Sequence, residues 1–568
     1  MKEPPLIVQT DRAVLLETQH PDYEMARDRL ARFAELEKSP EYVHFYRITP
    51  VSIWNAAALG EQADELLAWL VANSRFPIAP AMLAQIREWF RRYGLLRLYA
   101  HGDGGLRLEC DDAAVLQELA GHVTVAGMLT PLDARSMRLD AARRGDVKQL
   151  LIKLGYPIDD RAGYRQGDAL QFALREAAPA VPRAFRLREY QREAAAAFHA
   201  GGSDRGGCGV VVLPCGAGKT VVGIAAMHLL QTNTLVLTTN TIAVRQWCRE
   251  ILDKTDLGDA QVGEYTGEQK HIRPVTVATY QILTHRKGKL DAFTHLDLFD
   301  RGNFGLIVYD EVHLLPAPVF RATAGIQARR RLGLTATLVR EDGRADEVFS
   351  LIGPKRYELP WKQLERQGFL APARCVEVRV PLAAARRANY AAAGARSQFR
   401  IAADNEQKDD VVGALLRRHA RDRVLVIGQY IEQLQHLATV FRLPLITGQT
   451  PNADRDRLYG AFRRGELTSL IVSKVGNFAI DLPDANVAIQ VSGTFGSRQE
   501  EAQRLGRVLR PKQDGGPASF YTLVSADTRE QDFAKKRQLF LTEQGYSYEI
   551  VPASVLLAEN QGSREERA

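Results

Sequence analysis

The residues best equipped for chemistry lie in the segment VVVLPCGAGKTVVG, which joins a β-branched run to an apolar helical stretch. Gly216 and Gly218 let backbone N–H groups approach a phosphate, and a helix beginning after them adds the positive end of its dipole. Lys219 is the type of residue that reaches the β- and γ-phosphates, and the Thr220 hydroxyl is suited to bind Mg²⁺. The strict phosphate-loop pattern has glycine where this chain has Leu213, so the prediction of a nucleotide site depends on the placement of the loop between strand and helix.

A second chemical signal is the acidic pair in GLIVYDEVHLLPA. Asp310 and Glu311 end an apolar run, and open α/β sheets bind ligands at the carboxyl ends of their strands. Asp310 is suited to hold Mg²⁺ through its water shell, whereas Glu311 is suited to orient and deprotonate an attacking water. The alternative is an acidic helix start stabilised by the helix dipole. Because Lys219 lies 91 residues earlier (310 minus 219), the pair is predicted to complete a site for nucleotide hydrolysis.

A third signal lies much later, in SRQEEAQRLGRVLRPK. Gln503, Arg507 and Arg510 have the helical spacing i, i+4 and i+7, so one helix face would carry all three. A basic helix is usually only a solvated surface, but hydrolysis needs cationic donors at the γ-phosphate, and such an arginine finger accelerates it by about 10³ to 10⁵. If a second domain supplies these arginines, hydrolysis occurs when the cleft between the domains closes.

Two sets of short apolar runs are available to position these residues, and they have the character of buried parallel strands. The first set is GVVVLP, TLVLTT, VTVAT, GLIVYD and RLGLTAT, and the second is RVLVIGQY, PLITG, TSLIVSK, NVAIQVS and ASFYTLVS. Because helical stretches alternate with the runs, the sequence predicts two successive doubly wound α/β domains.

Residues 1–135 carry no catalytic signature and are predicted to form an α+β accessory region. The stretch PAMLAQIREWFRRYG has apolar residues at helical spacing, and LLRLYA, HGDGG and LRLEC follow as a two-stranded hairpin. This order suits a winged-helix-like module, which would either contact nucleic acid or pack against another domain. Residues 136–181 are a basic, partly helical piece, interpreted as a small domain or a linker that ends near the Pro-rich APAVPRAF.

The composition narrows the class of protein. Of 568 residues, 45% are hydrophobic and 25% charged, as in ordinary globular chains, and the net charge of +7 weakly favours a polyanionic partner. The five cysteines contain no close pair, which argues against a disulfide framework, a zinc knuckle or an iron–sulfur site. The N-terminus lacks an apolar signal core, and no apolar run approaches the roughly 20 residues of a membrane span. We therefore expect a cytoplasmic protein.

At its motifs the chain resembles the superfamily 2 helicases, and within them the XPB-type DNA helicases. LPCGAGKT, DEVH, TATLVRED, SKVGNFAIDLP and QRLGRVLRPK occur in family order and at family spacing. The likeness extends from LREYQ (187–191) to QGYSYEI near residue 550, and more weakly to IVQTDRAVLLE and YRITPVSIWNA. It implies two tandem RecA-like, doubly wound motor domains that use ATP and Mg²⁺, at residues 182–372 and 373–550, followed by a tail at 551–568.

The resemblance also implies roles for single residues. Gln191 takes an adenine-sensing position with Arg188 nearby, and His313 couples the nucleotide to the second domain. Arg507 and Arg510 are the arginine fingers, with Arg510 the stronger candidate. Thr335 and Thr337 link hydrolysis to strand movement, and the segment with Gly476 and Asp481 touches nucleic acid and the ATP cleft. Arg340, Glu341 and Asp342 match a motif for opening damaged duplex, in which Arg340 would act as a wedge.

The implied function is that of an ATP-dependent 3′→5′ DNA helicase or translocase that opens duplex DNA in nucleotide excision repair. Two alternatives stay open: an ATP-switched clamp on damaged DNA that recruits partners without processive unwinding, and an RNA-directed DExH ATPase. The expected partners are DNA junctions and, by analogy with family relatives, a nuclease, at a nucleoid-associated place in the cytoplasm. Residues 381–406 stand where the family has a DNA-gripping thumb, and their basic residues are Arg386, Arg387, Arg396 and Arg400, which suit either a reduced thumb or a surface helix.

Overall fold

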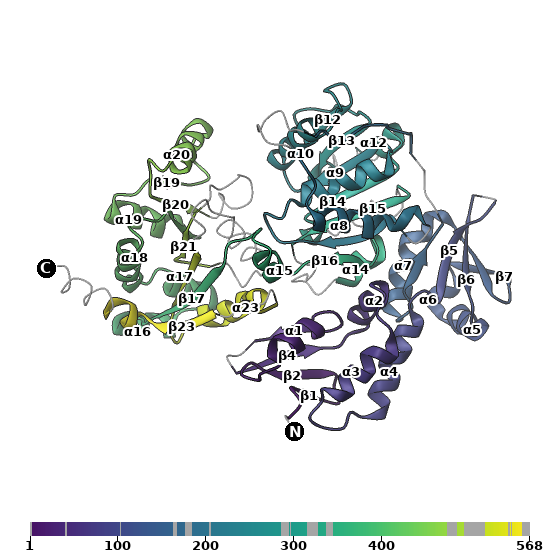
Figure 1. Ribbon diagram of the computed structural model, residues 1–568, viewed down its shortest axis with the longest axis horizontal. Helices are drawn as coiled ribbons and strands as arrows, with labels where there is room; N and C mark the ends of the chain where they lie inside the picture. The colour runs from purple at the N-terminus through teal and green to yellow at the C-terminus, as the bar shows by residue number, and fades with distance from the viewer. Residues whose placement is uncertain are drawn as a thin grey trace. The chain divides into compact units, whose positions relative to one another are not determined.

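The computed structural model describes residues 3–39, 42–102, 104–162, 167–176, 185–203, 206–283, 285, 295, 297–314, 328–336, 345–473, 485–493, 517–543, 546 and 548–558. The chain divides into two units. The first holds residues 1–35, 45–213 and 218–359, and the second holds residues 36–44, 214–217 and 360–568. Each unit contains one seven-stranded parallel sheet, as expected for two doubly wound domains (Figure 1).

All five runs predicted as strands in the first motor domain form strands of its sheet, whose order is β12-β13-β11-β14-β15-β10-β16. The strands are β10 (Cys208–Val212), β11 (Thr234–Thr238), β12 (Val262–Tyr265), β13 (Val275–Thr279), β14 (Leu306–Asp310), β15 (Arg330–Thr335) and β16 (Lys355–Glu358). The helices include α8 (Glu189–His199), α9 (Lys219–Leu230), α10 (Thr241–Lys254), α11 (Tyr280–Leu283), α12 (Asp297–Gly302) and α14 (Ala345–Leu351). The two strands that carry no long apolar run, VGEY and KRYE, are the sheet edges, where one side of the strand needs no burial.

The second sheet repeats this arrangement, with the order β19-β20-β18-β21-β22-β17-β23. Its strands are β17 (Ala373–Val380), β18 (Val424–Gly428), β19 (Leu445–Ile446), β20 (Ser469–Ser473), β21 (Val487–Gln490), β22 (Ala518–Ser525) and β23 (Tyr548–Pro552). The helices include α15 (Trp361–Arg366), α16 (Ala384–Ala392), α17 (Ala395–Ala403), α18 (Gln407–Arg418), α19 (Ile431–Phe441), α20 (Asn452–Arg464) and α23 (Arg529–Glu543). Counted along its own unit, each sheet has the strand order 3-4-2-5-6-1-7.

Two further sheets belong to the accessory region. One has the order β1-β2-β4-β3, and the other, β7-β8-β6-β5-β9, contains the predicted hairpin as β5 and β6 and extends across residue 135. The strands are β1 (Leu6–Val8), β2 (Ala13–Glu17), β3 (Glu35–Lys38), β4 (Val43–Arg47), β5 (Leu96–Ala100), β6 (Leu106–Cys110), β7 (Leu129–Asp133), β8 (Ser136–Leu139) and β9 (Ile158–Asp160). The helices are α1 (Tyr23–Leu30), α2 (Pro50–Ala58), α3 (Ala63–Ala72), α4 (Pro80–Arg92), α5 (Ala113–Gly121), α6 (Val123–Ala126) and α7 (Arg144–Lys153).

Buried charges and a main-chain strap join the accessory region to the first motor sheet. Asp160 accepts hydrogen bonds from Arg144 and from Lys148 Nζ (2.9 Å), and all three side chains are buried. Burial alone would raise the pKa of Asp160, but the charges of Lys148, Arg144 and Arg331 hold it well below its usual range. Residues 167–176 then run alongside the motor domain, with hydrogen bonds such as Leu170 N to the Gln231 carbonyl (3.0 Å). Arg331 lies in β15, so a charge of the first motor sheet acts on this buried cluster of the accessory region.

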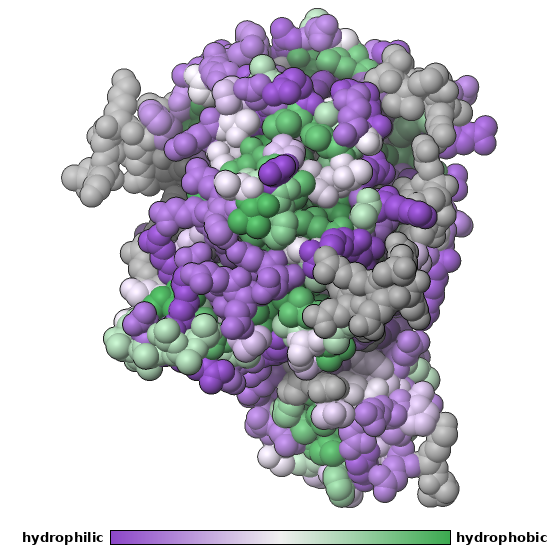
Figure 2. Space-filling model, turned by 90° about the vertical axis from the view of Figure 1, so that its left-hand side faces the viewer, coloured by the Kyte–Doolittle hydropathy of each residue, from purple (hydrophilic) through white to green (hydrophobic). Residues whose placement is uncertain are grey.

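Hydrophilic residues cover much of the face shown in Figure 2, with smaller hydrophobic areas between them. The large apolar side chains of the described residues that are more than half exposed are Met25, Tyr42, Phe76, Val123 and Val440. Within the described ranges, no helix combines the length and the apolar character needed to span a membrane.

Candidate nucleotide-hydrolysis site

The phosphate loop leaves the carboxyl end of β10, and its two glycines have left-handed backbone conformations. Gly216 has a φ of 84° and Gly218 a φ of 80°, a region that side chains disfavour. A Cβ atom on Gly218 would also lie only 2.6 Å from Nε2 of Gln191. The backbone conformation therefore favours glycine at residue 218, and a side chain there would also displace the end of Gln191, as expected of a loop that presents its N–H groups to a phosphate.

Leu213, the departure from the strict loop pattern, belongs to the sheet rather than to the turn. Its side chain is fully buried, and its N–H donates to the carbonyl of Thr335 at the end of β15 (3.0 Å). The chain therefore turns after residue 213, and a glycine is not needed there. Lys219 begins α9 directly after the loop, and the half-buried Thr220 is its second residue.

The acidic pair lies at the carboxyl end of β14, which is separated from β10 only by β15. Glu311 Oε1 lies 3.3 Å from Lys219 Nζ, so the structure brings together the lysine and glutamate predicted from separate motifs. Glu311 has a φ of 50°, a conformation that costs a non-glycine residue about 1–3 kcal/mol and is often found at functional sites. This bend turns the chain away from the strand at the point where the carboxylate meets Lys219.

Asp310 is surrounded more closely than its neighbour. Its Oδ2 accepts a hydrogen bond from Nε1 of Trp247 (2.8 Å), and its backbone carbonyl accepts one from the hydroxyl of Tyr280 (2.8 Å). Burial and the adjacent charge of Glu311 raise the pKa of Asp310 to about 6, against the opposing effects of the Trp247 hydrogen bond and the charge of Lys219. Two neighbouring carboxylates in a partly desolvated place are the kind of group that a divalent cation stabilises.

His313 connects the acidic pair to the next strand. Its Nδ1 and the hydroxyl of Thr335 form a 2.7 Å hydrogen bond, and both side chains are buried. The same ring nitrogen lies 3.5 Å from Oε2 of Glu311. The predicted coupling residues His313 and Thr335 therefore form a continuous path from Glu311 to the end of β15.

Gln191 and Arg188 lie at the start of α8. Gln191 Oε1 accepts a hydrogen bond from the backbone N–H of Arg188 (3.0 Å), and Nε2 of the same amide packs against Gly218. The Arg188 guanidinium donates to the hydroxyl of Tyr190 (3.0 Å). Of the two predicted residues, Gln191 therefore lies against the phosphate loop, and Arg188 contacts Gln191 and Tyr190.

Nine of the predicted site residues fall on parts of the chain outside the described ranges. They are Thr337, Arg340, Glu341, Asp342, Gly476, Asp481, Gln503, Arg507 and Arg510. Conversely, the sequence reasoning missed Trp247 and Tyr280. A buried indole N–H usually finds an acceptor, but nothing in the sequence identifies Asp310 as that acceptor.

The donor set fits a nucleotide with one divalent cation. Lys219 and the loop amides offer positive charge, whereas Thr220 and Asp310 offer the oxygen ligands that Mg²⁺ prefers. Among the described residues, no group of three or more His, Cys, Asp or Glu side chains could hold a metal by itself. In Mg²⁺ sites protein oxygens commonly supply few of the ligands, and phosphates and waters supply the rest.

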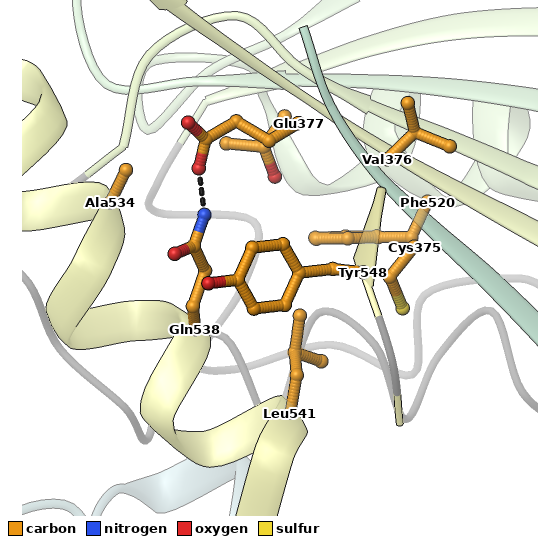
Figure 3. Close-up of a pocket in the computed structure, with 9 residues that line it drawn as sticks. Cys375, Val376, Glu377, Phe520, Ala534, Gln538, Leu541 and Tyr548 are labelled. Atoms are coloured by element: carbon orange, nitrogen blue, oxygen red, sulfur yellow. Dashed lines mark hydrogen bonds between the residues drawn. The ribbon is translucent and has the colours of Figure 1, made fainter. Parts of the chain in front are cut away.

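A pocket in the second unit is a different kind of feature. Figure 3 shows Gln538 of α23 donating a hydrogen bond to the buried Glu377 of β17. The lining residues are Cys375, Val376, Glu377, Phe520, Thr522, Ala534, Gln538, Leu541 and Tyr548. They lie near the middle of β17 and β22, whereas open α/β sheets bind ligands at the strand ends. We therefore assign this pocket no ligand.

Family models match most of the chain in three stretches. Residues 364–566 match "ERCC3/RAD25/XPB C-terminal helicase", residues 184–340 match "Type III restriction enzyme, res subunit", and residues 6–132 match "Helicase conserved C-terminal domain". The first stretch contains all strands of the second parallel sheet, the second contains those of the first sheet except β16, and the third lies in the accessory region.

Similar proteins align along almost the whole length. A "DNA 3'-5' helicase XPB" of Kineococcus radiotolerans is 53% identical over 97% of this chain and 97% of its own. A protein of the same name from Mycobacterium tuberculosis is 51% identical over 98% of this chain and 99% of its own. The "General transcription and DNA repair factor IIH helicase/translocase subunit XPB/SSL2" of Saccharomyces cerevisiae is 30% identical over 95% of this chain and 71% of its own.

Proposed function

The chain belongs to the XPB family of superfamily 2 helicases, and we propose that it is an ATP-driven 3′→5′ DNA helicase or translocase. The observation that carries the proposal is the convergence of Lys219, Asp310 and Glu311 beside the carboxyl ends of β10 and β14, within a chain similar to XPB helicases along 97% of its length. Opening a base-pair step costs about 1.4 kcal/mol on average, so hydrolysis must be coupled to movement along DNA.

In this proposal the first motor domain binds ATP through the phosphate loop. The N–H groups around Gly216 and Gly218 face the phosphates, and Lys219 exchanges its contact with Glu311 for the β- and γ-phosphates. Thr220 and Asp310 would hold Mg²⁺, which would neutralise charge on the phosphate oxygens. The raised pKa of Asp310 supports this role, because the bound cation would stabilise the carboxylate that burial disfavours.

Glu311 orients the attacking water and accepts its proton. The carboxylate is half-buried and already lies beside Lys219, so it is near the place where the γ-phosphate would be held. The His313–Thr335 hydrogen bond would then transmit a change at Glu311 to β15 and to the segment that follows it. By family resemblance, Arg507 and Arg510, with Gln503, complete the site from the second domain, and Thr337, Arg340–Asp342, Gly476 and Asp481 connect it to DNA.

The expected setting is nucleotide excision repair, with a nuclease as a partner and a nucleoid-associated location. The repair role is supported by the yeast relative, whose name includes a DNA repair factor. A damage clamp without processive unwinding and an RNA-directed ATPase use the same site chemistry, so the substrate must decide between them.

The test is ATP hydrolysis by the purified protein with no nucleic acid, single-stranded DNA, duplex DNA or RNA, alongside unwinding of a forked duplex. We expect stimulation by DNA, unwinding of forks with a 3′ loading strand, and loss of both activities in Lys219→Ala. Stimulation by DNA without unwinding would support the clamp, whereas stimulation only by RNA would overturn the choice of substrate.

A further inference from the structure

Asp310 is held on both its side chain and its backbone by two aromatic residues outside the predicted motifs. Trp247 comes from α10, which follows β11, and Tyr280 begins α11, directly after β13. In the sheet these strands lie on one side of β14, in the order β13-β11-β14. Two donors, one from α10 and one from the start of α11, therefore converge on Asp310, which with Thr220 is expected to hold Mg²⁺.

Trp247 is locked in place by its packing. The side chain is 1% exposed, and a Cβ atom on Gly223 of α9 would lie 2.5 Å from its Cη2 atom. The ring thus occupies space that α9 leaves open by carrying a glycine. Because an indole N–H only donates and the ring cannot move, Oδ2 of Asp310 is fixed and the carboxylate has one orientation.

Tyr280 acts on the next peptide bond. Its hydroxyl donates to the carbonyl of Asp310 at 2.8 Å, and its side chain is 1% exposed. That carbonyl belongs to the peptide that leads into Glu311, whose φ is 50°. A hydrogen bond that fixes this peptide also fixes the bend that brings the Glu311 carboxylate to Lys219.

We propose that Trp247 and Tyr280 are positioning residues for hydrolysis: Trp247 orients the Asp310 carboxylate toward the cation, and Tyr280 holds Glu311 in place for the attacking water. This inference rests on the proposed function, because it assigns tasks within the same site. Because the two residues have different tasks, loss of the Trp247 donor should change the Mg²⁺ requirement, whereas loss of the Tyr280 hydroxyl should change kcat. Partners that orient a metal ligand typically change metal affinity or activity by about 10–100-fold.

The first test is Trp247→Phe, which keeps a ring but removes the N–H donor. Binding of mant-labelled AMPPNP is followed by fluorescence polarisation while Mg²⁺ is varied, with no turnover required. We expect the Mg²⁺ concentration at half-saturation to rise about 10–100-fold, with nucleotide binding in EDTA unchanged. Trp54→Phe, at a buried tryptophan of α2, is the matched control. A Mg²⁺ requirement within twofold of the original protein, or an equal change in the control, overturns the role of Trp247.

The second test is Tyr280→Phe, which removes only the hydroxyl. We expect kcat to fall about tenfold or more while the Mg²⁺ requirement stays within twofold, since Asp310 keeps its Trp247 bond. Tyr265→Phe is the matched control, because this buried tyrosine donates or accepts at His295 (2.9 Å) instead. If both kcat and the Mg²⁺ requirement match the original protein, Tyr280 is only a packing residue.

Two readouts keep these outcomes separate from failure of the proposed function. Thermal unfolding without nucleotide identifies a variant whose changed kinetics reflect a damaged fold. If Trp247→Phe is such a variant, Trp247→Tyr, which supplies a hydroxyl donor, is measured for partial recovery of Mg²⁺ binding. No recovery in a folded Trp247→Tyr protein counts against the role. If the original protein itself shows no DNA-stimulated hydrolysis, the proposed function fails, whereas Mg²⁺-dependent nucleotide binding still tests Trp247.

Discussion

The two parallel sheets have the same strand order, and each has a lysine–glutamate pair at its strand ends, but the two pairs differ in solvent exposure. In the first sheet, Lys219 and Glu311 lie 3.3 Å apart at the strand ends, and their side chains are 11% and 20% exposed. In the second sheet, Lys408 and Glu530 lie 2.9 Å apart and are 1% and 0% exposed. The first pair is accessible to a ligand, and the second is closed.

The closed pair has all the partners that a buried ion pair needs. Lys408 Nζ donates to both Glu530 oxygens (3.1 and 2.9 Å) and to the carbonyl of Val491 (2.9 Å), and Glu530 also accepts from the N–H of Ser525 (2.9 Å). Val491 follows the fifth strand of its sheet and Ser525 ends the sixth. Glu311 and Thr335 have those same positions in the first sheet. Equivalent strand ends thus carry the candidate site in one unit and a fully buried internal contact in the other.

The largest expected difference between the two pairs is catalytic. Glu311→Gln should lower kcat by about 10²–10⁴-fold while nucleotide still binds, because the amide cannot accept a proton from water. Glu530→Gln in the closed pair should change the measured kcat only as far as it lowers the fraction of folded protein, so kcat per folded molecule should stay the same. Steady-state hydrolysis and polarisation with mant-labelled AMPPNP measure both. Equal losses of kcat per folded molecule would mean that the closed pair is part of the catalytic site.

The next effect is on stability, where we expect the closed pair to matter more than the open one. Lys408→Met leaves Glu530 buried without its cation, which typically costs about 3–5 kcal/mol, whereas Lys408→Met combined with Glu530→Met removes both charges and should recover most of that loss. Urea unfolding of the full chain followed by circular dichroism measures the change. A double variant no more stable than the single one would indicate that the pair contributes more than the avoidance of an isolated charge.

The strands of this fold were largely readable from the sequence. All ten apolar runs became strands. Nine of them lie inside their sheets, where a parallel strand is buried on both faces and needs continuous apolar residues, whereas the tenth, β19, is a two-residue edge strand. The edge strands β12, β16 and β23 do not need a continuous apolar run, and apolar residues alternate with polar ones in β17, ARCVEVRV. The sequence therefore did not identify these four strands.

Some residues of the candidate site could be predicted from the sequence, and others could not. Lys219, Asp310 and Glu311 were found because phosphate and Mg²⁺ chemistry demands particular residue types at strand ends. Trp247 was missed because its contribution depends on a contact between α10 and β14, and a contact between distant segments leaves no local pattern. The same holds for Lys408 and Glu530, which are 122 residues apart and look like ordinary surface charges in the sequence.

Gly223 offers a smaller perturbation of the open site. Gly223→Ala places a Cβ 2.5 Å from Trp247 and 3.3 Å from Cδ1 of Leu334, so we expect an overpacking cost of about 1–3 kcal/mol, together with a weaker Mg²⁺ response. Gly258→Ala is the matched control, since no atom lies within 4 Å of its added Cβ. Thermal unfolding and Mg²⁺ titration check the result. Unchanged Mg²⁺ binding in a destabilised Gly223→Ala protein would show that the ring can shift without disturbing Asp310.

The pKa of Asp310 predicts a pH dependence for the open site. Folding raises this pKa from 3.8 to about 6, so this carboxyl removes stability from the nucleotide-free protein as the pH rises through that window. Mg²⁺ needs the ionised form, so Mg²⁺-dependent nucleotide binding should weaken about tenfold per pH unit below about 6 and level off above it. Glu311→Gln removes a charge that raises the pKa, so it should move the midpoint downward, whereas titration of the nucleotide itself stays constant. A midpoint unaffected by Glu311→Gln would contradict the assignment.

The smallest effect is expected at a third pair, on the surface of the second sheet. Arg374 Nη2 lies 2.6 Å from Glu549 Oε2, closer than either lysine–glutamate pair, yet the two side chains are 49% and 53% exposed. The Arg374 hydrogen bond lowers the pKa of Glu549, but water and salt screen the attraction, and such pairs contribute about 0–1 kcal/mol. Glu549→Gln should therefore shift urea unfolding by less than Lys408→Met does, and the effect of Glu549→Gln itself should shrink in high salt. A loss comparable to that of Lys408→Met would mean that distance, rather than burial, decides what a pair contributes in this sheet.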